Sequence, residues 1–160
     1  MKNLYQIFTC ACALGAIATH STTLQAQSTL FGAQQLITQI HNPSSVYAAD
    51  LDNDGDSDLL SASSGDNKIA WYEKDGSGNF GVQQIITTAA NYATSVYAAD
   101  LDNDGDSDVL SASSGDNKIA WYEKDGNGNF AAQQIITTAA NGAYSVYAAD
   151  LDNDGDADVL

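Results

Sequence analysis

The sequence contains no arginine, and no aspartate or glutamate occurs before Asp50. Its only permanently basic side chains are five lysines, set against 21 acidic residues. A chain without a basic patch cannot neutralise the phosphates of a nucleic acid. Nucleic acid is therefore excluded as the expected partner.

Cysteine is almost absent as well, and both copies, Cys10 and Cys12, fall within residues 1–26. This segment is typical of a secretory signal peptide, with Lys2 as a short positive region followed by an apolar run over 7–18. We expect cleavage after Ala26, although Leu24 is larger than the residue preferred at its place. The mature chain, secreted or displayed on the surface of a cell expected to be bacterial, would then lack disulfides and redox centres.

Two alternatives for the leader remain open but are less favoured. The apolar run is shorter than the roughly 20 residues of a membrane-spanning helix. Thr9 before Cys10 is a poor context for attachment of a lipid. We therefore expect no membrane span in the mature chain.

The acidic residues are concentrated rather than spread. Fifteen of the 21 lie in 50–58, 100–108 and 150–158, with five aspartates in each, while six acids outside these segments face the five lysines. The formal charge of −16 thus comes almost wholly from local clusters. Such clusters repel themselves unless a cation is bound.

The chain is built from a repeat of 50 residues. Segments 46–95 and 96–145 match at 44 of 50 positions without a gap, and a third copy covers 146–160. A period of this size with several short strands is typical of propeller blades, and the long amphipathic segments of helical repeats are absent. We predict an all-β chain of two and a third repeats, preceded by an N-terminal strand region at 27–45.

Within the first repeat, strands are predicted at 46–49, 59–63, 68–74 and 80–87, separated by the acidic loop and by turns rich in glycine, asparagine and aspartate. Four antiparallel strands with regular turns describe one propeller blade. Residues 31–38 align with 80–87, which predicts that the mature chain opens on a fourth strand that completes the last blade of a ring. Further repeats or domains are expected beyond residue 160.

Each acidic segment has aspartates at positions one, three, five, seven and nine with glycine at position six, so we predict one calcium ion per loop and up to three in the chain. Positions one, three, five and nine would bind through carboxylates, and position seven through its backbone carbonyl with its side chain facing water. A solvated turn is the simpler alternative, but it gives no reason for the spacing to occur three times. The predicted ligands are Asp50, Asp52, Asp54, Asp56, Asp58, Asp100, Asp102, Asp104, Asp106, Asp108, Asp150, Asp152, Asp154, Asp156 and Asp158.

Other calcium loops begin in the same way but end differently. An EF-hand requires a bidentate glutamate at the twelfth position and flanking helices. Here the twelfth residues are Ser61 and Ser111 and the flanks have strand character. Dockerin loops are also excluded, because they require an apolar eighth residue, where this chain has Ser57 and Ser107.

The segment from Asp50 to Ser63, together with Phe80-Gly81, resembles the FG-GAP repeat of integrin alpha chains and its bacterial relatives, the VCBS repeats. The resemblance covers about residues 30–160. It implies a propeller, typically of seven blades, with calcium supporting the loop between the first and second strands of a blade. It also implies that a ligand, where one exists, binds on a face of the propeller.

The other candidate residues give weaker indications of function. Trp71 and Tyr72, with Trp121 and Tyr122, fit core packing better than a sugar-stacking platform, and His41 fits the surface. No phosphate-binding loop, nucleophile elbow or metalloprotease motif occurs, so we expect no enzymatic activity.

The leading expectation is a binding or adhesion module with an unknown extracellular protein or glycan ligand. A non-catalytic accessory propeller of a secreted polysaccharide lyase or hydrolase is the alternative, and a purely structural repeat array remains possible.

Overall fold

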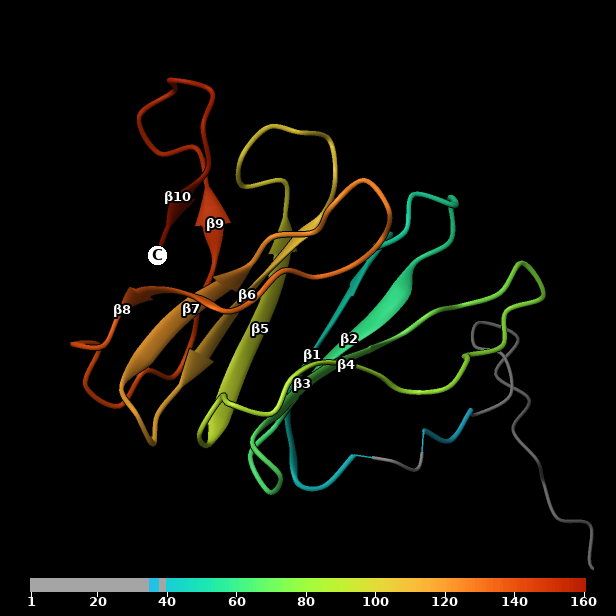
Figure 1. The fold of residues 1–160 in the computed structure, drawn as a ribbon, viewed down its shortest axis with the longest axis horizontal. Helices are drawn as coiled ribbons and strands as arrows, with labels where there is room; N and C mark the ends of the chain where they lie inside the picture. The colour runs from blue at the N-terminus through green and yellow to red at the C-terminus, as the bar shows by residue number, and fades with distance from the viewer. Residues whose placement is uncertain (1–34, 38–39) are drawn as a thin grey trace, which may run out of the picture. The chain divides into compact units, whose positions relative to one another are not determined.

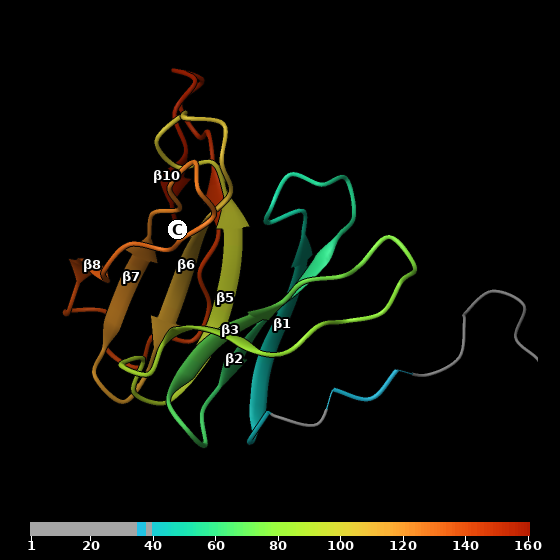
Figure 2. The same ribbon diagram turned by 45° about the vertical axis from the view of Figure 1, so that its right-hand side comes forward.

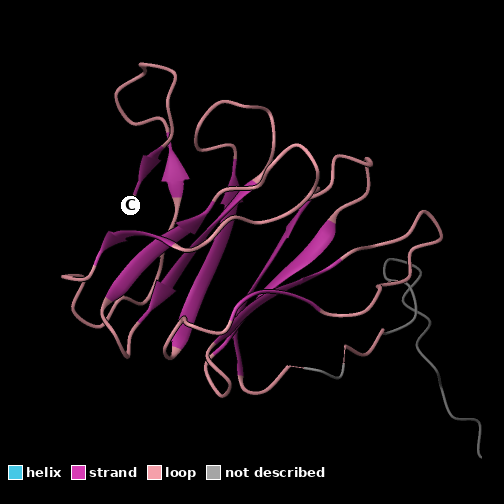
Figure 3. Cartoon of the chain, in the orientation of Figure 1, coloured by secondary structure: helices cyan, strands magenta, loops and turns pink. Residues whose placement is uncertain are grey.

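The computed structural model describes residues 35–37 and 40–160, and this part of the chain consists of strands and loops without a helix (Figures 1 and 3). It accordingly contains no helix that is long and apolar enough to cross a membrane. The predicted signal peptide at 1–26 lies outside the described residues. Most of the strand predicted at 31–38 does too, and the described residues 35–37 are loop.

The first sheet is an antiparallel meander of four strands. It contains β1 (Pro43–Ala49), β2 (Asp58–Ser63), β3 (Lys68–Tyr72) and β4 (Gln84–Thr87), in that spatial order. The register pairs Tyr47 with Leu60 and Leu60 with Trp71. Each strand therefore lies beside its neighbour in sequence, as in a propeller blade.

The second sheet repeats the first fifty residues later, and a third begins after it. Strands β5 (Ala93–Ala99), β6 (Asp108–Ser113), β7 (Lys118–Tyr122) and β8 (Gln134–Thr137) form the second four-stranded sheet. Strands β9 (Ala148–Ala149) and β10 (Asp158–Val159) form a two-stranded sheet. The prediction of an all-β fold built from four-stranded antiparallel propeller blades is confirmed.

The strand boundaries differ from the prediction in all four strands of the first sheet, with β1 beginning at Pro43 rather than 46 and β2 at Asp58 rather than 59. The third strand ends at Tyr72 rather than 74, because the backbone N–H of Lys74 donates to Asp58 Oδ1 at 2.8 Å instead of to a neighbouring strand. The fourth strand begins at Gln84 rather than 80, and Phe80 forms only an isolated bridge with Lys74. A tight turn over 75–79 therefore separates the strands more widely than expected.

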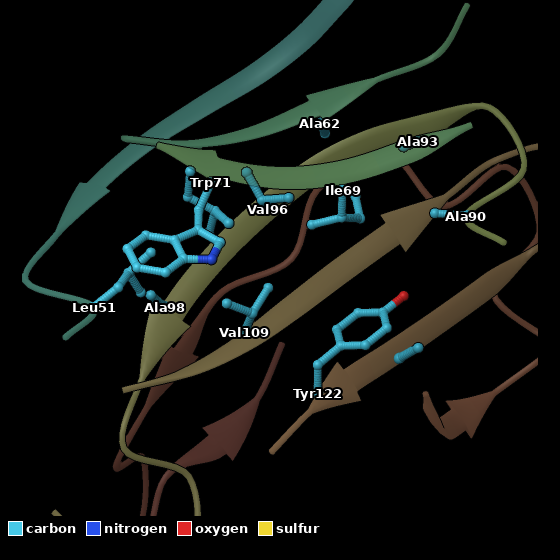
Figure 4. Close-up of a cluster of buried hydrophobic side chains, with 12 residues drawn as sticks. Leu51, Ala62, Ile69, Trp71, Ala90, Ala93, Val96, Ala98, Val109 and Tyr122 are labelled. Carbon is cyan, nitrogen blue, oxygen red and sulfur yellow. The ribbon is translucent and has the colours of Figure 1, made fainter. Parts of the chain in front are cut away.

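The core lies between successive sheets. Strand β5 contacts β1, β2 and β3 across the interface (Figures 1 and 2). Leu51 and Trp71 of the first repeat lie in one buried cluster with Val96 and Val109 of the second (Figure 4). The ring of Trp71 also meets Phe130 edge to face, with centroids 6.5 Å apart. Each blade therefore buries its apolar face against the next.

The aromatic pairs behave as core residues, as predicted. Trp71, Tyr72 and Tyr122 are buried, and Trp121 is partly buried. His41 lies on the surface, with 77 % of its side chain exposed, which confirms the expectation for it.

Candidate metal centre

The acidic loop between β1 and β2 folds around its own carboxylates. Asn53 and Gly55 have left-handed backbone angles, φ 61° and 95°, which reverse the chain sharply. Asp50 Oδ1 accepts the N–H of Asp54 at 3.1 Å, and its Oδ2 accepts the N–H of Gly55 at 3.0 Å. The backbone donors of the reversal thereby hold the first carboxylate of the loop at its centre.

Asp58, the ninth loop residue, anchors the loop to the sheet. Its side chain is buried, and its Oδ2 accepts the N–H of Leu51 at 2.9 Å. Its Oδ1 accepts the N–H of Lys74, just after β3, at 2.8 Å. Asp108 is equally buried and makes the same two contacts at 3.1 and 2.8 Å. This carboxylate therefore joins the beginning of the loop to the end of the third strand.

Three carboxylates converge in every loop, at positions one, three and nine. In each group, one oxygen per residue lies within 4.8 Å of the others. The groups are Asp50, Asp52 and Asp58; Asp100, Asp102 and Asp108; and Asp150, Asp152 and Asp158. Hard oxygen donors at such spacing fit a hard dication, with backbone carbonyls and water completing the shell.

The fifth-position carboxylates, Asp54, Asp104 and Asp154, lie outside these groups. Asp54 Oδ1 instead accepts the N–H of Asp56 at 2.8 Å, and Asp104 and Asp154 make the corresponding bonds. The structure therefore brings together positions one, three and nine of each loop, and the role of position five as a ligand stays a prediction.

The seventh-position side chains do not simply face water, contrary to expectation. Asp56 Oδ1 lies 3.5 Å from Lys74 Nζ. Asp106 Oδ1 accepts a hydrogen bond from Asn53 Nδ2 at 2.9 Å and lies 3.9 Å from Lys124 Nζ, with only 18 % of its side chain exposed. Position seven thus connects the loop to its surroundings.

The grouping of negative charge alters the acidity of the loop. Burial, and then the charge of Asp58, raises the pKa of Asp52. Burial raises the pKa of Asp108 to about 6, helped by the charges of Asp102 and Asp104 and opposed by two backbone hydrogen bonds. Both shifts are the response of an ionised carboxylate to desolvation and like charge. A bound cation would relieve them.

Sequence reasoning did not identify the contact between neighbouring loops. Asn53 donates to Asp106, and Asn103 donates to Asp156 Oδ1 at 2.7 Å, so the fourth residue of one loop reaches the seventh of the next. The available signal was the recurrence of asparagine at the fourth position with a period of fifty residues. That signal does not reveal a side-chain partner.

Comparison with known proteins agrees with this geometry. The sequence profile of the FG-GAP-like repeat matches residues 50–111 and 100–160, which is more than half of the chain. No curated protein matches the chain. The profile spans the acidic loops and most of the strands of the described sheets, and the sheets have the architecture of propeller blades. The chain therefore belongs to the FG-GAP-like repeat family.

Proposed function

We propose that this chain is a calcium-binding β-propeller module, secreted or displayed on the cell surface, that acts in binding or adhesion. The observation that carries the proposal is the recurrence of a converging carboxylate triad in all three loops. In this proposal, calcium stabilises the fold and has no catalytic role.

The buried aspartate of the triad supports a structural role. Asp58 holds Leu51 and Lys74 through backbone hydrogen bonds while its carboxylate faces Asp50 and Asp52. Burying one charge beside two others of the same sign is unfavourable. A dication offsets this repulsion and so strengthens the link between the loop and the third strand.

The proposed location matches the ion. Residues 1–26 have the pattern of a signal peptide, and FG-GAP-like repeats are typical of extracellular or surface proteins. Extracellular calcium sites work with dissociation constants of about 10⁻⁴ to 10⁻³ M. Exposed loops with three converging carboxylates suit this range.

We further propose that the module is not an enzyme. The three converging aspartates of each loop must stay ionised to hold a cation, which makes them poor proton shuttles. The expected function is to present a rigid surface to a ligand.

The test is a calcium titration of the purified chain by isothermal calorimetry, with terbium luminescence as a second readout. Asp52→Asn and Asp102→Asn are each expected to remove one binding event, because each takes one carboxylate from a triad. Asp75→Asn is the matched control, because Asp75 is an acid of the turn at 75–79 outside the triads. Absence of saturable binding, or equal binding in all three variants, would refute the metal site.

A further inference from the structure

A pocket of about 360 Å³ lies at the end of the strands opposite the acidic loops. Strand β1 begins beside this pocket and ends at the first acidic loop, and its seven residues separate the two by about 20 Å. The pocket crosses from the first sheet to the second. Its walls carry hydroxyl groups and no charge: Ser44, Ser64, Tyr92, Thr94, Ser114 and Tyr144.

Three of the six residues that line the pocket, Tyr92, Thr94 and Tyr144, stand at positions where the two complete repeats differ. The two complete repeats differ at six positions only, and two of these differences are Tyr92 against Gly142 and Thr94 against Tyr144. Both exchange a small side chain for an aromatic one. A nearly uniform array therefore acquires its largest side-chain differences at this pocket.

The backbone conformation of Tyr92 is energetically unfavourable for a bulky residue. Its backbone φ is 50°, in the left-handed region that bulky residues avoid, whereas the equivalent positions carry Asn42 and Gly142, which tolerate it. Burial does not compensate, because 61 % of Tyr92 is exposed. Backbone outliers of this kind cluster at ligand-binding sites.

The ring of Tyr92 is nevertheless held in place. A Cβ at Gly115 would lie 2.9 Å from Tyr92 Cδ2, so the missing side chain of Gly115 makes room for the ring. Tyr144 is 81 % exposed. The fold thus presents two aromatic rings to solvent beside one pocket.

Three hydroxyl groups of the pocket, those of Thr94, Ser64 and Ser114, already donate to backbone carbonyls. Thr94 Oγ1 donates to the carbonyl of Ala143 at 2.8 Å, and Ser64 Oγ donates to that of Asn42 at 3.2 Å. Ser114 Oγ donates to the carbonyl of Tyr92 at 3.4 Å. Because each proton is already used, the remaining lone pairs are available to donors on a ligand.

From these observations we infer that the pocket binds a neutral oligosaccharide. Sugars offer many O–H donors for the fixed acceptors and apolar C–H faces for the two tyrosine rings. A neutral ligand fits because the walls carry no cation and the chain has a net charge of −16, which repels anions. This inference rests on the proposed function as a binding module and supplies its site and ligand class.

The test uses isothermal calorimetry and saturation-transfer NMR with neutral hexasaccharides of glucose, xylose and mannose, and with an oligogalacturonate as the anionic comparison. At least one neutral probe should bind saturably. Tyr92→Gly and Tyr144→Thr install the residue that the other repeat carries and should each weaken binding about tenfold. Tyr92→Gly should also melt at an equal or higher temperature, because it removes the unfavourable φ.

Ser77→Asn is the matched control, because it installs the residue of the second repeat at a position outside the pocket, and it should bind like the parent chain. The inference is overturned if no neutral probe binds, if the oligogalacturonate binds as tightly, or if both tyrosine variants bind unchanged. Calcium titration of the same samples distinguishes failure of the sugar-binding pocket from failure of the proposed calcium sites. Retained calcium binding with no sugar binding overturns this site alone, and sugar binding without calcium binding overturns the metal proposal alone.

Discussion

The side-chain amide of Asn53 donates a hydrogen bond of 2.9 Å to Asp106 Oδ1 in the next acidic loop. Asn103 and Asp156 repeat the contact at 2.7 Å. Loops that are fifty residues apart in sequence are thus linked side by side, and each link ends on an aspartate of the following loop. Ordering one loop therefore helps to order the next.

Asn53→Gly should destabilise the chain by about 1 kcal/mol, the usual net worth of one hydrogen bond. Glycine keeps the left-handed φ of 61° without strain, so the change isolates the lost amide. Urea unfolding measures the effect. Asn153→Gly is the control, since φ is 62° there and the described residues contain no later loop for its amide to reach. An equal loss in both variants would show that the contact contributes nothing.

Asp108→Asn should destabilise the chain by about 1–3 kcal/mol, the cost of a buried polar group left without a partner. Both oxygens of Asp108 accept backbone N–H groups, and an amide can offer an oxygen to only one of them. Asp158→Asn is the matched control, because Asp158 is exposed at the equivalent position. Chemical denaturation in chelator separates this effect from metal loss. Similar losses for the buried and exposed positions would contradict the anchoring role.

Asp116 should make the free energy of unfolding depend on pH in the acidic range. Burial alone would raise its pKa, but hydrogen bonds from Lys118 and Ser113 and the charge of Lys118, 2.8 Å away, outweigh burial and lower it. A folded-state pKa below the unfolded value stabilises the fold above the unfolded value, about 3.9, and this contribution is lost as the pH falls through the lowered pKa.

The measurement is urea unfolding of the parent chain and Asp116→Asn in chelator across the acidic range. The stability difference between them should shrink as the pH falls below about 4. A difference that stays constant would contradict the lowered pKa. Asp125→Asn serves as the comparison, because hydrogen bonds within its own turn lower the pKa of Asp125 and no lysine of the described residues pairs with it.

The fold was largely predictable because its signals are local and repeated. The turn at 75–79 and the acidic loop separate short apolar segments, and the period of fifty residues identifies the blade. The strand ends were not predictable in the same way. The N–H of Lys74 leaves the sheet for Asp58, a partner sixteen residues earlier that only the folded loop brings near.

The sequence predicted which residue types form the candidate metal site. It predicted less well what each aspartate of the loop contacts. The spacing predicted carboxylate ligands at positions one, three, five and nine, whereas Asp54, at position five, lies outside the converging group and its Oδ1 accepts the N–H of Asp56. Asp58 completes the group, as predicted for the ninth position. The bond from Asn53 to Asp106 crosses between repeats, so no local pattern predicts it.

Calcium binding to the folded state is tested by the thermal melt of the chain, measured by scanning calorimetry in millimolar calcium and in chelator, with magnesium as the control ion. Binding to the folded state alone stabilises it by about 0.4–1.4 kcal/mol per site when free calcium is one to ten times the dissociation constant. The melting temperature should rise with calcium concentration and fall on chelation, with a smaller response to magnesium. Identical melts in calcium and in chelator would show that the folded chain binds no calcium.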